Sequence, residues 1–182
     1  LGYTSNGTTG YLDSNLAANA GTTFTQNSGS FGTYGTTASA ASAAISIGVI
    51  SATIISQILP RFTSAADVNG CSSVASGLST GPNHASNGFT FISRDTSNSE
   101  KCWQFYSDTS FSVSDGSTSS GTPPALNFFI CARNNTGVSV DSFTTDTIAL
   151  AFIGGALSDA QAAAWAGFVN SYMTSLGIAA HS

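Results

Sequence analysis

The carboxylates of this chain are the first candidates for chemistry, because most enzymes that hydrolyse glycosidic bonds use two of them about 5–10 Å apart. Glu100 is the only glutamate among nine acidic residues, and it stands beside Lys101 in a predicted turn. Asp141 and Asp146 are five residues apart, so they fall on opposite faces of any strand that runs through both. No E-x-D-x-E pattern is present. We therefore expect no catalytic residues and no enzymatic activity, with glycan hydrolysis as an alternative.

The two histidines give no better support for a nucleophilic triad. His84 follows Gly, Pro and Asn in a predicted loop, and His181 lies in the last residues of the chain. Neither stands near a G-x-S-x-G pattern, which would present a nucleophilic serine on a sharp turn. We expect both side chains to be exposed to solvent and to take no part in catalysis.

Calcium is the one cofactor that the sequence suggests. Asp95 with Asn98, or Asp141 with Asn135, could supply the carboxylate and carbonyl oxygens that Ca²⁺ prefers. The same residue types end strands by forming Asx turns, in which the side chain bonds to the backbone two residues later. We favour the turn interpretation and expect no metal site, with Ca²⁺ as the alternative.

Aromatic side chains are the better candidates for binding, since their faces stack on sugar rings. In a strand that contains Trp103, Phe105 and Tyr106, alternation places the first two on one face and Tyr106 on the other, so most of this set is expected to be core. The candidate ligand-binding residues are two of these aromatics and two residues of a predicted turn: Trp103, Tyr106, Asn134 and Asn135.

The composition indicates a folded domain with very few charges. The chain has 182 residues, of which 41% are hydrophobic, enough for one core, so we predict a single domain over residues 1–182. Only 7% are charged, against about 25% in typical domains. Disordered segments are instead charged and poor in apolar residues. A polar, uncharged surface favours a secreted or virion protein over a cytosolic enzyme, with a virion or extracellular location.

The basic residues exclude one class of partner. There are only four of them, they are scattered, and the net charge is −5. A nucleic-acid-binding protein needs several cationic side chains on one face to neutralise phosphates. We therefore expect no nucleic-acid partner.

The cysteines and the longest apolar stretch also have simple interpretations. Cys71, Cys102 and Cys131 are odd in number and lack metal-ligand spacing, so we expect small buried side chains, with one disulfide and a leftover thiol as the alternative. The apolar stretch 38–59 contains several serines and is divided by Gly48. Two strands explain it better than a helix that spans a membrane, so no membrane span is predicted.

The end of the chain has the clearest pattern. Residues 147–153 are mostly apolar and precede two glycines, which predicts a strand buried on both faces. Apolar residues then recur every three or four positions, which predicts an α-helix over about 158–176. Ser158 and Gln161 are spaced to form a capping box at its start, and Gly177 suits its end.

Two aromatic residues of that helix have two interpretations. Trp165 and Phe168 lie three positions apart in the apolar stripe, so the simplest expectation is that they pack the helix against a sheet. A helix on the outside of a sheet could instead offer them as a contact in an oligomer. We retain Trp165 and Phe168 as the candidate oligomer contact.

The remainder of the chain predicts many short strands separated by turn residues, which is typical of a β-sandwich or barrel. Residues 1–6 and Tyr11 onward are expected to pair as an opening hairpin around a glycine-containing turn. The fold class is therefore mainly β, with antiparallel sheets and one C-terminal helix.

Three parts of the sequence resemble concanavalin A-like (laminin-G-like) jelly-roll domains of bacteriophage tail and other virion proteins. They are residues 6–13, residues 26–34, and residues 130–137 taken together with 151–161 and the helix that follows. In such domains the final strand similarly leads through a Leu-Ser-Asp turn into a short helix, as Leu157, Ser158 and Asp159 do here.

This resemblance implies an antiparallel jelly-roll β-sandwich and a role on a phage particle. The expected function is a non-enzymatic structural, decoration or tail-fibre module, sometimes with adhesion to glycans. Expected partners are further copies of this chain, other virion proteins and a cell-surface glycan. A secreted carbohydrate-binding, lectin-like domain is the alternative.

Overall fold

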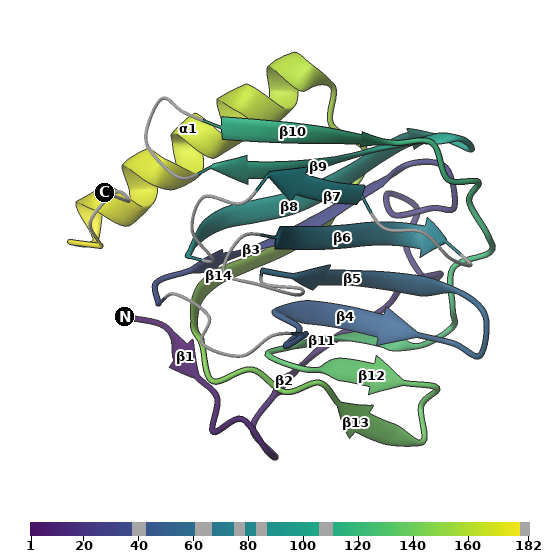
Figure 1. Cartoon of the computed structure of the whole chain (residues 1–182), viewed down its shortest axis with the longest axis horizontal. Coiled ribbons are helices and arrows are strands. Elements are labelled where there is room, and N and C mark those ends of the chain that lie inside the picture. The colour runs from purple at the N-terminus through teal and green to yellow at the C-terminus, as the bar shows by residue number, and fades with distance from the viewer. Residues whose placement is uncertain (38–42, 61–66, 75–78, 83–86, 106–110, 179–182) are drawn as a thin grey trace.

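The computed structural model describes residues 1–37, 43–60, 67–74, 79–82, 87–105 and 111–178. Over these ranges the chain is mainly β, with two sheets and one helix at its C-terminal end. Figure 1 shows this helix beside the stacked strands. The predicted fold class is confirmed at this level.

The first sheet has six strands, and every neighbouring pair in it is antiparallel. Because β3 lies at its centre, this sheet joins segments that are far apart in sequence. In spatial order its strands are β1 (Tyr3–Thr4), β14 (Thr147–Gly154), β3 (Gly29–Gly35), β8 (Gly88–Thr96), β9 (Ser99–Phe105) and β10 (Phe111–Gly116).

The second sheet has eight strands and one departure from the predicted antiparallel arrangement. β12 runs parallel to β4, while the other pairs are antiparallel. β11 pairs with both β2 and β4, which adds a branch to the main path. The strands are β13 (Ser139–Asp141), β12 (Arg133–Asn135), β4 (Ile47–Ile50), β5 (Ile55–Leu59), β6 (Asp67–Val74), β7 (Ser79–Pro82), β11 (Asn127–Ile130) and β2 (Leu12–Ala17).

Alternation along the strands of the first sheet creates two apolar layers. Phe31 on β3 and Ile92 on β8 face the second sheet and pack with side chains such as Phe128. Tyr34 and Phe91, on the same strands, point the other way into a separate aromatic cluster below the helix. The first sheet is therefore covered on both faces, by the helix on one and by the second sheet on the other.

The helix α1 (Asp159–Ser175) begins as the sequence predicts. Ser158 Oγ accepts from the amide of Gln161, and Gln161 Oε1 accepts from the amide of Ser158, so the capping box is confirmed. Ala162, Ala166, Val169 and Met173 share one stripe and are buried against the first sheet. The two alanines allow the helix backbone to approach the aromatic layer closely.

Several other expectations are also decided. Cys102 and Cys131 are buried free thiols, as predicted. Within the stretch 38–59, the described residues form β4 and β5, and no helix in the described ranges is long and apolar enough to span a membrane. The predicted opening hairpin is wrong, because β1 pairs with β14 and β2 pairs with β11.

The closing strand β14 is less buried than predicted. Of residues 147–154, only Ile148 is fully buried, and the others are half-buried. Both faces of the strand are covered, by α1 and by the second sheet, but one of its edges lies open beyond Ile148 because β1 pairs only with Thr147 and Ile148. The apolar run was consistent with burial on both faces but gave no information on the strand's edges.

Candidate functional site

The outward side of α1 carries an apolar surface that the fold leaves uncovered. Phe168, Tyr172 and Leu176 are 62%, 47% and 42% exposed, and Trp165 is half-buried. Steps of three and four residues separate them, so all four lie along one side of the helix. We call Trp165, Phe168, Tyr172 and Leu176 the exposed stripe.

Ring packing fixes the N-terminal half of the exposed stripe. Trp165 meets Phe152 of β14 edge to face, with ring centroids 5.6 Å apart. On its other side Trp165 stacks on Phe168 at 5.5 Å, with an angle of 15° between the ring planes. The expected packing onto the sheet is therefore confirmed for Trp165 and is wrong for Phe168, which extends the aromatic surface into solvent.

An open apolar depression adjoins these rings. It has a volume of about 460 Å³ and is lined by Leu157, Gln161, Ala164, Trp165 and Phe168. The nearest charges belong to an exposed ion pair, in which Lys101 Nζ lies 2.8 Å from Asp159 Oδ1. Because Asp159 is the only charged residue of α1, the stripe can be covered without desolvating a charge in the helix beyond its first turn.

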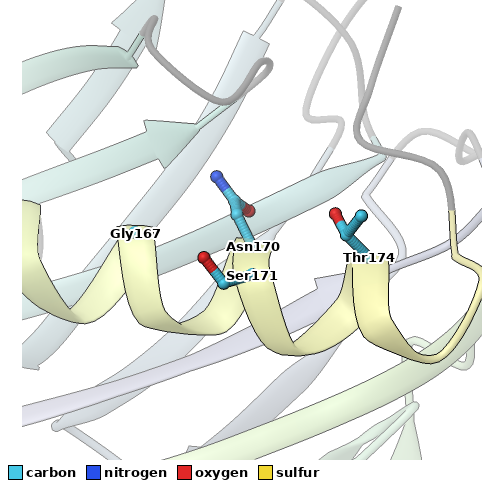
Figure 2. A pocket seen from close by; sticks show the side chains of 4 residues that line it. All are labelled: Gly167, Asn170, Ser171 and Thr174. Carbon is cyan, nitrogen blue, oxygen red and sulfur yellow. The ribbon is translucent and has the colours of Figure 1, made fainter.

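The opposite flank of α1 borders a polar depression of about 460 Å³ (Figure 2). Its described lining consists of Gly167, Asn170, Ser171 and Thr174. Asn170 is only 6% exposed, and its Oδ1 atom has no hydrogen-bond partner within the described residues. Figure 2 shows the Asn170 side chain standing off the helix beside Ser171. The two flanks of one helix thus differ sharply in polarity.

The two aromatic ligand-binding candidates do not offer a surface for stacking. Trp103 is 3% exposed and lies parallel to Phe91 and Phe105, with ring centroids 6.0 and 6.2 Å away. It belongs to the aromatic cluster that α1 covers, so neither face of its ring is free for a sugar. Tyr106 lies outside the described residues.

The two asparagines predicted to bind a ligand have structural partners. Asn134 is 5% exposed, donates from Nδ2 to the carbonyl of Asn127 and accepts the amide of Gly137 on Oδ1. Asn135 donates from Nδ2 to Asp141 Oδ2 at 2.8 Å. Asn134 thus holds the β12–β13 turn, whereas Asn135 joins a partly exposed polar cluster.

That polar cluster centres on a two-point contact between Arg133 and Asp141. Arg133 Nε and Nη2 each lie 2.9 Å from one carboxylate oxygen of Asp141, and Arg133 Nη1 donates to Gln57 Oε1 at 3.1 Å. Burial raises the pKa of Asp141, but the hydrogen bonds and charge of Arg133 and the bond from Asn135 outweigh it, so the pKa lies below its usual value.

Sequence reasoning missed Arg133 as a member of this cluster. Its eight-residue separation from Asp141 across the asparagine-containing turn was the available signal. The pairing also bears on the proposed Ca²⁺ ligands, because both oxygens of Asp141 already accept from a cation. The other suggested ligand, Asn98, accepts from Ser119 on its Oδ1 atom.

Glu100, the residue considered for hydrolysis, is part of a buried link between the sheets. Its side chain and that of Arg94 are 0% exposed, and their Oε2 and Nη2 atoms are 2.9 Å apart. Glu100 Oε2 also accepts the amide of Ser72 on β6, whose carbonyl accepts from Arg94 Nε. A carboxylate so enclosed cannot reach a substrate. Removing one partner of such a pair typically costs about 3–5 kcal/mol.

Other reactive groups are enclosed or lie outside the described part. Burial, with a smaller contribution from Glu100, raises the pKa of the Cys102 thiol to about 12. Burial, together with the charge of Asp146, raises the pKa of Cys131 to about 12. Over the described ranges no three His, Cys, Asp or Glu residues group as metal ligands. His84 and His181 are outside those ranges.

Comparison of the chain with protein-family models, curated proteins and solved structures gives no match.

Of the features described, the exposed stripe is the one that the fold itself does not use. The Arg133–Asp141 cluster is internally satisfied, Trp103 is core, and Glu100 is an anchor. Large apolar patches on a protein surface typically mark an interaction site. The stripe, with its adjoining depression, is therefore the candidate functional site.

Proposed function

We propose that this protein is a non-catalytic structural module that associates with further copies of itself through the exposed stripe of α1. The observation that carries the proposal is the pair of outward aromatic rings, Phe168 at 62% and Tyr172 at 47% exposure, on a helix already anchored by another stripe. Tyr and Phe are enriched in protein interfaces, where charged residues are depleted.

A second copy is the occupant that the chemistry of the stripe favours. If two helices pair antiparallel about a two-fold axis, Phe168 meets its counterpart and Trp165 meets Tyr172 of the other copy, so the stripe complements itself. No like charges oppose this contact, since Asp159 in the first turn is the only charge of α1. The low charge of the whole chain supports close packing of identical copies.

The area of the stripe bounds the strength of this contact. A fully covered aromatic side chain buries about 150–250 Å², and the rings of the stripe are already partly covered by their own chain. Two such stripes bury less than the roughly 1,200–2,000 Å² of a stable standard interface. We therefore expect a weak, reversible dimer, which an array of many copies would strengthen.

The setting that we propose is a virion or extracellular particle, with the two sheets forming a concanavalin A-like jelly roll. The resemblance of the segments around Tyr11, Phe31 and Ser158 supports this part of the proposal, together with the two-sheet architecture and its C-terminal helix. Other proteins of such a particle would be further partners. No step of this role needs a bound cofactor.

Adhesion to a glycan is the second candidate, because the Arg133–Asp141 cluster holds polar groups rigidly at a partly exposed position. The side chains of Arg133 and Asp141 are 21% and 35% exposed. A glycan array tests this role. Saturable binding that Asn135→Ala abolishes would support it, and an array without saturable signals would exclude the tested glycans as ligands.

Sedimentation equilibrium tests the proposed self-association. Wild-type protein is expected to rise from the monomer mass of 18.3 kDa toward twice that value as its concentration increases. Phe168→Glu should hold the monomer mass, because it places two like charges at the centre of the contact. Ala163→Glu, an equal charge on an exposed position of the other flank, should behave as wild type. A wild type that stays monomeric at millimolar concentration, or equal effects of both variants, would contradict the proposal.

A further inference from the structure

The open edge of β14 is a second surface that the fold leaves incomplete. On one side β14 pairs with β3 through Gly154. On the other side β1 pairs only with Thr147 and Ile148, through the partners Thr4 and Tyr3. A register shift between Ile148 and Leu150 marks the place where this coverage stops. Within the described part of the chain, no strand pairs with residues 150–154 on that side.

Exposure follows the same boundary. β3, which has a strand on each side, is buried at every residue. Ile148, where β1 is present, is 6% exposed, whereas residues 149–154 are all half-buried. Phe152 packs toward α1 and Ile153 toward the second sheet, so both faces of this segment are covered. The remaining exposure therefore comes from the uncovered edge.

An apolar groove runs along this edge. Two neighbouring cavities, of about 250 and 310 Å³, share Ile130 and Ala151 in their linings. Leu12 lines one of them, and Leu16 lines the other. Neither lining includes a charged residue. Exposed sheet edges usually carry a charge or a proline that prevents pairing with another chain, and residues 150–154 have neither.

We propose that the edge of β14 binds an extended segment of another polypeptide chain as an added strand. This strand lies in line with β1 and runs antiparallel to β14, because that direction continues the pairing β1 already makes. It spans about five residues, or about 17 Å at 3.4 Å per residue. Its sequence is uncharged, with apolar side chains at alternate positions that enter the groove, and β1 limits its length at one end.

Fluorescence anisotropy with defined peptides tests this proposal. The probe is a fluorescein-labelled peptide of alternating threonine and isoleucine, seven residues long, with a lysine at each end for solubility. We expect saturable binding to the full chain and slower hydrogen exchange of the amides of residues 150–154. Two further peptides carry N-methyl groups on every second residue, in opposite phases. Because alternate amides of a strand face opposite sides, one phase should abolish binding and the other should preserve it.

Variants locate the binding site and separate it from the exposed stripe. Leu12→Lys, a change at a side chain that is already 41% exposed, puts a charge in the groove and should weaken peptide binding at least tenfold. Ala163→Lys on α1 is the matched control and should bind as wild type, as should Phe168→Glu. The proposal is overturned by an absence of saturable binding, by equal effects of the two N-methyl phases, or by unchanged affinity in Leu12→Lys.

Discussion

Two apolar stripes run along α1, and they differ in what covers them. Ala162, Ala166, Val169 and Met173 form the buried stripe, whose members are at most 1% exposed and pack on the aromatic layer of the first sheet. In the exposed stripe, the larger side chains Phe168, Tyr172 and Leu176 are more than 40% exposed. The small and medium-sized residues attach the helix, and the large ones face outward. The difference teaches that docking of α1 accounts for only half of its apolar surface.

The same contrast recurs within the first sheet. β3 is buried at every residue, and its neighbour β14 is half-buried along the edge that β1 leaves open. In both places an apolar surface continues past the point where the chain covers it. The fold therefore presents two incomplete surfaces, one on a helix and one on a strand edge, and both are free of charged side chains.

Truncating the buried stripe should give the largest effect. Met173→Ala removes a side chain that is 1% exposed and leaves a cavity below α1. We expect a loss of about 2–5 kcal/mol in the free energy of unfolding. Urea denaturation followed by tryptophan fluorescence measures it. A loss below about 0.5 kcal/mol would mean that α1 is not held by this stripe.

Removing the helix cap should give an intermediate effect on both stripes together. Ser158→Ala leaves the amide of Gln161 without its side-chain acceptor, and we expect a loss of about 1 kcal/mol. Thermal denaturation measures the change. Ser171→Ala, at an exposed position inside the helix, is the matched control, and its unfolding free energy should stay within about 0.5 kcal/mol of wild type.

Substitution in the exposed stripe should have the smallest effect on folding. At protein concentrations where the chain is monomeric, Phe168→Glu should change the unfolding free energy by no more than about 0.5 kcal/mol, because an exposed side chain contributes little to the fold. Urea denaturation under the same conditions as for Met173→Ala provides the comparison. A loss as large as that of Met173→Ala would erase the distinction between the two stripes.

Local signals explain what the sequence alone could predict. The capping box depends on two residues three positions apart, and the helix depends on a repeat of three and four, so both are encoded within one segment. The burial of Cys102 and Cys131 follows from their apolar strand neighbours. Trp165 and Phe168 were identified as candidates from their spacing, although spacing did not show which of the two faces solvent.

Non-local pairing explains what could not be predicted. β1 crosses to β14 instead of forming the opening hairpin, and β12 lies parallel to β4, because strand partners are chosen by the whole sheet. The Arg94–Glu100 pair is only six residues apart in sequence, but its burial depends on Ser72 and β6 of the other sheet. Trp103 looked available for a ligand because the sequence did not show that α1 would cover it.

Disulfide cross-linking at residue 168 tests the central claim most directly, that two copies meet through the exposed stripe. In an antiparallel pair of helices, residue 168 lies opposite its own counterpart. Under mild oxidation, Phe168→Cys should therefore form a covalent dimer at protein concentrations where Ala163→Cys stays monomeric on a non-reducing gel. Cys102 and Cys131 are buried and should not contribute. Equal cross-linking of the two variants, or none in Phe168→Cys, would contradict the account.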